Sequence, residues 1–158
     1  MGGPRPILII DTSVFVKDAL SRTRSGSATQ LLAIAPAITQ VVMCDELREE
    51  VLEQLERHLG WSTETARDTY GPIFDAARWV TPVPERDDHR LMEHDIDDII
   101  LVRVAEAVFV DAIDITDADQ VRYIVSENIR HLRPGSAYAG FLFGTAHRVF
   151  EALRNAPA

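Results

Sequence analysis

Apolar residues occur along the chain in two patterns, short continuous runs and longer stretches with helical spacing. One run fills residues 7–10, and nearly continuous runs fill residues 40–44 and 123–126. Such runs are typical of strands that are buried on both faces of a sheet. Between residues 45 and 59, leucine or valine recurs at every fourth position, as on one face of an amphipathic helix. The alternation of the two patterns favours a parallel sheet covered by helices.

The same patterns predict the order of the elements. We expect about five strands, at residues 7–10, 40–44, 79–83, 123–126 and 141–143. We expect helices at residues 14–20, 28–35, 45–58, 62–77 and 96–109, and a last helix that Thr145 caps and that runs to about Arg154. Pro36 is expected to end the second helix, Gly60 the third, and Thr12 or Ser13 to cap the first. The predicted fold class is α/β, a three-layer α/β/α sandwich with a central parallel sheet and chemistry at the carboxyl ends of the strands.

Length and residue usage bound the class of protein. A chain of 158 residues is expected to form a single domain, 1–158, with an adequate apolar core. Cys44 is the only cysteine, which excludes a disulfide framework and a multi-cysteine zinc site. No apolar stretch approaches the ~20 residues of a membrane span. We therefore expect a soluble, cytoplasmic protein with no membrane partner.

The charge balance argues against general electrostatic binding of nucleic acid. The chain has 25 acidic and 16 basic side chains, of which only Lys17 is a lysine, and its formal net charge is −9. Non-specific nucleic-acid binding normally needs a basic surface that neutralises phosphates. A metal-dependent nuclease remains compatible with this balance, because a cluster of carboxylates that binds cations adds negative charge of its own.

Acidic residues follow several of the predicted strands and begin one of the helices. They are Asp11, the helix residues Glu46, Glu49, Glu50 and Glu53, the pair Asp95 and Asp98, and the segment Ser126-Glu127-Asn128. Ordinary roles are open for each, since Asp11 is also suited to cap a helix and a glutamate on an amphipathic helix is usually solvated. Gathered in one crevice, however, these oxygens would suit Mg²⁺ or Mn²⁺, and the chemistry that follows is phosphodiester hydrolysis.

The motifs that contain these acids resemble those of the PIN domain family, which includes many prokaryotic ribonuclease toxins. ILIIDTSVFV is similar to the family's first strand and first acid, and carries that role to Asp11. VVMCDELREEVLEQL is similar to the second motif and carries the helix glutamate to Glu50, with Glu46 and Glu53 as alternatives in register. DIDDIILVRVAEA resembles the third motif and carries an acid to Asp98, with Asp95 nearby.

The fourth motif of the family has two candidates in this chain. YIVSENIRHL resembles a strand followed by Ser or Thr and then Asp or Asn, which places Asn128 there, although many members have an aspartate. The segment 111–120 lengthens the usual link, so Asp117 or Asp119 is the alternative. We expect Asp11 and Asp98 to be the principal metal ligands, with Glu50 and Asn128 completing the catalytic set.

The resemblance also implies a substrate and partners. It predicts a Mg²⁺- or Mn²⁺-dependent endoribonuclease, the toxin of a toxin-antitoxin pair, which binds an RNA substrate and a cognate antitoxin and forms a homodimer. Arg130 and Arg133 are the candidate substrate-binding residues, since guanidinium groups bind phosphate. The alternative function is an inactive PIN-like module that binds RNA or protein. A third interpretation, a doubly wound phosphohydrolase with Asp11 as nucleophile, lacks the second acid that this chemistry usually has two residues later.

Overall fold

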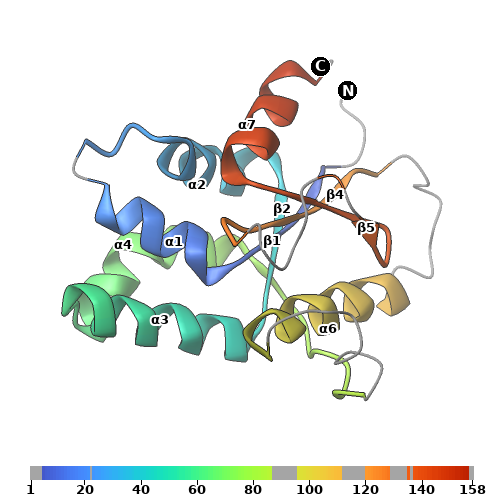
Figure 1. Cartoon of the computed structure of the whole chain (residues 1–158), viewed down its shortest axis with the longest axis horizontal. Coiled ribbons are helices and arrows are strands. Elements are labelled where there is room, and N and C mark those ends of the chain that lie inside the picture. Colours follow the sequence, from blue (N-terminus) through green and yellow to red (C-terminus); the bar gives the residue numbers. More distant parts are fainter. Residues whose placement is uncertain are drawn as a thin grey trace.

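Six strands form one mixed, mostly parallel sheet in the part of the chain that the structure describes (Figure 1). The structure is a computed structural model, which describes residues 5–21, 23–86, 96–111, 120–128, 135 and 137–156. Within residues 96–111, it describes side chains only for residues 99–109. The strands are β1 (Ile7–Ile10), β2 (Gln40–Met43), β3 (Arg78–Trp79), β4 (Arg122–Val125), β5 (Ala137–Tyr138) and β6 (Phe141–Gly144). Their order is β3-β2-β1-β4-β6-β5, and only β5 is antiparallel to its neighbour.

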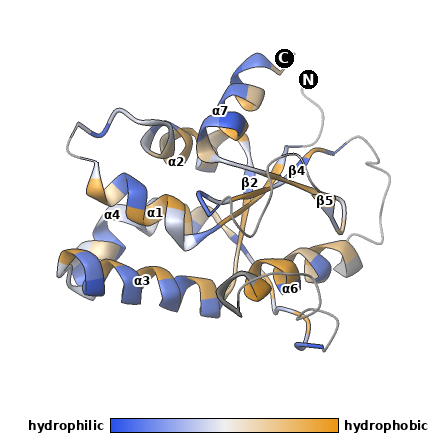
Figure 2. Ribbon diagram, in the orientation of Figure 1, coloured by the Kyte–Doolittle hydropathy of each residue, from blue (hydrophilic) through white to orange (hydrophobic). Residues whose placement is uncertain are grey.

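Six helices accompany the sheet within the described residues. They are α1 (Thr12–Leu20), α2 (Ser27–Ile38), α3 (Asp45–Leu59), α4 (Thr63–Ala76), α6 (Ile96–Asp111) and α7 (Ala146–Asn155). Figure 1 shows α2 and α7 on one side of the sheet and α6 on the other, which agrees with the expected α/β class and with a layered arrangement. In Figure 2, α6 is apolar along most of its length, whereas α3 has a polar outer face. None of the described helices is long and apolar enough to cross a membrane.

Strand β1 lies at the centre of the sheet and fixes where the polar residues after it are placed. Its four apolar residues are all buried, because β2 and β4 pair with it on either side and helices cover both faces. Parallel pairing aligns Ile10 with Val125, the last residues of β1 and β4. The backbone N–H of Asp11 then donates to the carbonyl of Val125 at 2.8 Å. Asp11 and Ser126 are therefore neighbours at the carboxyl edge of the sheet.

Most of the predicted elements are confirmed, with small differences at their ends. Gly60 ends α3 in a left-handed conformation, and Ser62 caps α4 by accepting a hydrogen bond from the N–H of Thr65 at 3.1 Å. Thr145 caps α7 in the same way through the N–H of Arg148.

Four expectations about the elements differ from the structure. The sheet has six strands where about five were expected, since a two-residue β5 returns antiparallel to β6, and β3 is shorter than expected. Helix α2 continues past Pro36 to Ile38, because a proline this close to a helix end removes only one helical hydrogen bond. Neither Thr12 nor Ser13 caps α1, since the helix already begins at Thr12.

A buried carboxylate, Asp18, connects three helices. It lies on α1 with 1% of its surface exposed, and it accepts hydrogen bonds from the hydroxyl of Tyr70 on α4 at 2.7 Å and from that of Thr29 on α2. The guanidinium of Arg24 lies 3.3 Å away and neutralises the charge. Burial, together with the hydrogen bond to Asp18, raises the pKa of Tyr70 above its ordinary value. Asp18 is thus fully partnered and has a structural role.

Replacing Tyr70 by phenylalanine is expected to destabilise the protein and to change its response to alkaline pH. Loss of a hydrogen bond to a buried charge should lower the free energy of unfolding by about 1.5–3 kcal/mol at pH 7. Above pH 10.0, the ordinary pKa of tyrosine, Tyr70 ionises in the unfolded chain but stays protonated in the folded one. The unfolded state then binds fewer protons, so wild-type stability should fall with rising pH by up to about 1.4 kcal/mol per unit.

Urea denaturation between pH 7 and pH 11 checks this expectation. Burial raises the pKa of Cys44 as well, but that contribution is common to both proteins. The Tyr70→Phe protein should therefore show a shallower loss of stability above pH 10 than the wild type. Equal slopes in the two proteins would contradict the assignment of Tyr70 as a buried neutral donor.

Candidate functional site

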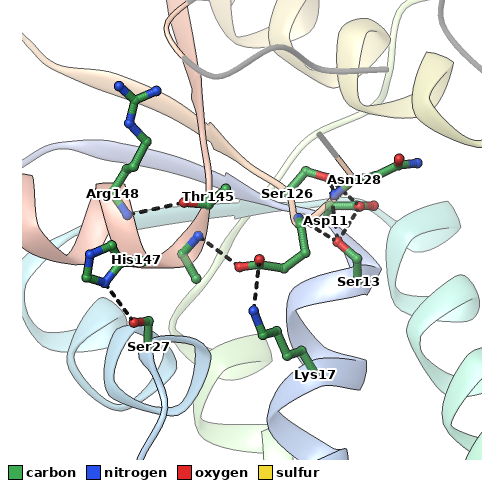
Figure 3. Close-up of polar contacts among 11 residues, drawn as sticks. Asp11, Ser13, Lys17, Ser27, Ser126, Asn128, Thr145, His147 and Arg148 are labelled. Carbon is green, nitrogen blue, oxygen red and sulfur yellow. Dashed lines mark hydrogen bonds and ion pairs between the residues drawn. The ribbon is translucent and has the colours of Figure 1, made fainter. Parts of the chain in front are cut away.

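Asp11 occupies the first position after β1, and its carboxylate is almost entirely buried, with 6% of the residue exposed. It stands at the N-cap position of α1 but accepts no capping hydrogen bond from the helix. Instead its Oδ2 accepts from the hydroxyl of Ser13 at 2.7 Å and from the hydroxyl of Ser126 at 2.8 Å (Figure 3). Asp11 therefore takes the N-cap position without the capping hydrogen bond expected of its side chain, and two serine hydroxyls hold its carboxylate instead.

The two serines that hold Asp11 are themselves fixed by the loop that follows β4. The hydroxyl of Ser126 accepts from the N–H of Asn128 at 3.0 Å, and that of Ser13 accepts from the N–H of Glu127 at 3.0 Å. Each hydroxyl therefore donates to the carboxylate and accepts from the backbone, which leaves it no free orientation. Within the described residues Oδ1 of Asp11 makes no hydrogen bond, so one carboxylate oxygen is oriented and available.

A cavity of about 450 Å³ opens beside Asp11 between α1, α3 and the loop after β4. It is lined by Asp11, Thr12, Ser13, Val16, Lys17, Leu20, Glu50, Gln54, His58 and Asn128. Three of the four residues expected to be catalytic, Asp11, Glu50 and Asn128, therefore share one cavity. The volume is within the range of about 300–1,000 Å³ that is usual for small-ligand sites.

The structure separates Glu50 from the other glutamates of α3. Glu50 lines the cavity, whereas Glu53 forms an ion pair with Arg57 at 2.6 Å and Glu46 lies 3.3 Å from Arg103 of α6. Neither Glu46 nor Glu53 lines the cavity. Of the three register alternatives, the one at this cavity is Glu50.

The remaining predicted residues are placed only in part. Asp98 belongs to the first turn of α6, and the contact between Arg103 and Glu46 brings that helix beside the start of α3, as Figure 1 also shows. The side chain of Asp98 lies outside what the structure describes. The same holds for the whole of Arg130 and Arg133 and for the alternatives Asp95, Asp117 and Asp119.

Several residues of the site were not identified from the sequence. Lys17 lines the cavity and forms an ion pair with Glu127 at 3.1 Å, while the other oxygen of Glu127 accepts from the N–H of Ala146 at the start of α7 (Figure 3). The sequence pattern suggests Ser13 only as a cap of the first helix, not as a partner of Asp11. A serine two residues after a strand-end aspartate is a recognisable signal, because short polar side chains bond locally to such turns.

The donors around the cavity suit a hard divalent cation. The free oxygen of Asp11, the carboxylate of Glu50 and the amide of Asn128 are oxygen ligands of the kind that Mg²⁺ and Mn²⁺ prefer. Thr12 adds a buried hydroxyl oxygen for which the described residues provide no hydrogen-bond partner. Among the side chains that the structure describes, no three His, Cys, Asp or Glu residues form a metal-binding group.

Comparison with known proteins leaves the site to be interpreted from its own chemistry. No protein-family model matches the chain, and neither does any curated protein. Three features of the fold bear on function: the buried carboxylate, the serines that orient it and the cavity beside them.

Replacing Ser126 by alanine is expected to destabilise the fold, because it removes one donor to a buried carboxylate and the acceptor for the N–H of Asn128. Unfolding in urea should show a loss of about 1–3 kcal/mol. A matched control is Ser25→Ala in the exposed loop before α2, which should change stability by less than about 0.5 kcal/mol. If the two variants were equally stable, the serine would not be holding Asp11.

Proposed function

We propose that this protein is a metal-dependent endoribonuclease with a PIN-like fold, which hydrolyses phosphodiester bonds of RNA. The observation that carries the proposal is the state of Asp11, a buried carboxylate that lines a cavity, with one oxygen held by two serines and the other without a hydrogen bond from any described residue. A buried charge whose only role is structural would be expected to have partners on both oxygens, as Asp18 has in Thr29 on one oxygen and Tyr70 and Arg24 on the other.

The proposed metal ligands are Asp11 and Asp98. When bound, a divalent cation stabilises negative charge on a phosphoryl group under attack and favours deprotonation of the attacking water. Asp11 contributes a carboxylate whose direction is set before any ligand arrives, since Ser13 and Ser126 fix its other oxygen. Little reorganisation is then needed when the site is occupied.

Glu50 and Asn128 have separate proposed roles in the same cavity. The carboxylate of Glu50 would orient the attacking water and accept its proton, a role that needs an acidic side chain within hydrogen-bond reach. Asn128 is neutral and would orient a water or a phosphate oxygen through its amide. The backbone N–H of Asn128 is already engaged by Ser126, which holds this residue in place.

Positive charge for the substrate would come from a few side chains rather than from the whole surface. Lys17 lines the cavity with its side chain 61% exposed, and its ion pair with Glu127 holds the amine there. Arg130 and Arg133 are proposed as further phosphate contacts. By the resemblance to PIN toxins, an antitoxin that covers the cavity and a homodimer are proposed as the partners.

Cleavage of a labelled single-stranded RNA tests the proposed activity. We expect cleavage with Mn²⁺ or Mg²⁺, none with EDTA, and losses of about 10²- to 10³-fold in kcat/KM for Asp11→Asn and for Asp98→Asn, since a bound cation supplies several kcal/mol. Calorimetric titration with Mn²⁺ on the same proteins shows whether the loss follows metal binding. Absence of both cleavage and metal binding would overturn the nuclease and favour a PIN-like binding module.

A comparison within α3 tests the role of Glu50. Glu50→Gln should lower kcat by about 10²-fold or more, as expected when a general base is removed. Glu53→Gln is the matched control, because Glu53 lies outside the cavity and is paired with Arg57. Equal activities of the two variants would exclude Glu50 from the reaction.

A further inference from the structure

The cavity beside Asp11 extends beyond the acidic residues. Glu50, Gln54 and His58 are spaced four residues apart on α3, and all three line it. Eight residues of helix span about 12 Å, so this wall continues well past the carboxylates. Val16 and Leu20, also four apart, line the cavity from α1. The same cavity therefore continues from its acidic end along α1 and α3. The part lined by Val16, Leu20, Gln54 and His58 forms a second compartment of this cavity.

The two walls of this second compartment differ in character. On the α1 side lie Val16 and Leu20, and Leu20 is 55% exposed, so that its side chain is accessible to a ligand. On the α3 side lie Gln54 and His58, whose side chains are hydrogen-bonded to one another at 2.8 Å. None of these four residues is an acid, so a ligand here is recognised by apolar contact and hydrogen bonds. An apolar wall facing an amide and an imidazole suits a flat heterocycle, whose faces are apolar and whose edge is polar.

The hydrogen bond between His58 and Gln54 determines what the amide offers to a ligand. A carbonyl oxygen only accepts, so Nε2 of His58 donates to Oε1 of Gln54. The two N–H donors of the Gln54 amide remain for a ligand. They match a carbonyl oxygen on the ligand's edge, which guanine and uracil present and adenine lacks.

We propose that this second compartment is a nucleobase subsite, in which Gln54 selects the base next to the cleaved phosphate and His58 orients Gln54. The proposal rests on the proposed function for its substrate class. The phosphate lies at the acidic end near Lys17, and the base lies between Leu20 and Gln54. Guanine and uracil are preferred over adenine.

Two measurements test the subsite, and each is made on the wild type and on the Gln54→Ala and His58→Ala variants. The first sequences the products of a random-sequence RNA cleaved with Mn²⁺, which gives the base preference at the cut. The second titrates guanosine, uridine and adenosine 5′-monophosphates in Mg²⁺ and follows the resonances of α3 by NMR, which needs no cleavage. Both substitutions are expected to preserve helix α3, because alanine has a high helix propensity and neither residue is fully buried.

We expect the wild type to bind guanosine and uridine monophosphates about five- to tenfold more tightly than adenosine monophosphate. Gln54→Ala should remove this preference, and His58→Ala should reduce it. Leu20→Ser should weaken all three equally, because contact with the face of a base is not specific to the base. Glu56→Ala, an exposed neighbour on α3 outside the cavity, should leave the preference unchanged.

The outcomes separate this proposal from the proposed function. If the wild type cleaves RNA without a base preference, or with a preference that Gln54→Ala keeps, the proposed subsite is wrong and the proposed nuclease activity is retained. If the wild type cleaves no RNA but prefers guanosine and uridine monophosphates, and Gln54→Ala removes that preference, the subsite is supported and the proposed nuclease activity is wrong. Binding of no mononucleotide overturns the subsite directly.

Discussion

The burial of the Asp11 carboxylate at the end of the central strand is the constraint on which the site depends. A charge in this position is unfavourable unless it is hydrogen-bonded, and its two donors come from residues 113 positions apart, Ser13 and Ser126. They meet only because β1 and β4 pair in parallel with Ile10 beside Val125. A slip of one residue in that pairing would remove Ser126 from the carboxylate, so the register of the sheet and the geometry of the site are specified together.

Two buried aspartates in this region differ in the partners of their carboxylates, and this difference separates a structural residue from a candidate ligand-binding one. Asp18 and Asp11 are seven residues apart and both nearly inaccessible. Asp18 has a tyrosine, a threonine and an arginine around its carboxylate, which leaves it nothing further to bind. Asp11 has two serines on one oxygen, and it lines a cavity. The difference lies in the partners that the described residues supply, since burial and residue type are the same, and it is the reason that Asp11 rather than Asp18 is proposed to bind a ligand.

The sequence predicted those features that depend on local pattern. Buried strands such as β1 and the amphipathic helix α3 follow from hydrophobic spacing, and the position of Asp11 follows from the end of its strand. Strand β5 escaped prediction because two residues carry no periodicity. The choice among Glu46, Glu50 and Glu53 could not be made from sequence either, since all three suit an amphipathic helix and only the packing of α3 against α1 decides which one lines the cavity. The contacts of Ser13 with Ser126 and Glu127 likewise arise only when β1 and β4 are paired, and Gln54 lines the cavity only because α3 packs beside α1.

The net charge of −9 bears on how such a protein would recognise RNA. Proteins that bind nucleic acid without sequence preference gain most of their affinity by neutralising phosphates along a basic surface. This chain has a single lysine at the cavity, and its surplus of acids opposes a polyanion elsewhere. Affinity in the proposed nuclease must then come from the cation, from a few positive side chains such as Lys17, Arg130 and Arg133, and from contacts to a base within the cavity. Base contacts carry sequence information whereas phosphate contacts do not. An acidic ribonuclease of this design would therefore be selective in sequence because it has so little general affinity to rely on.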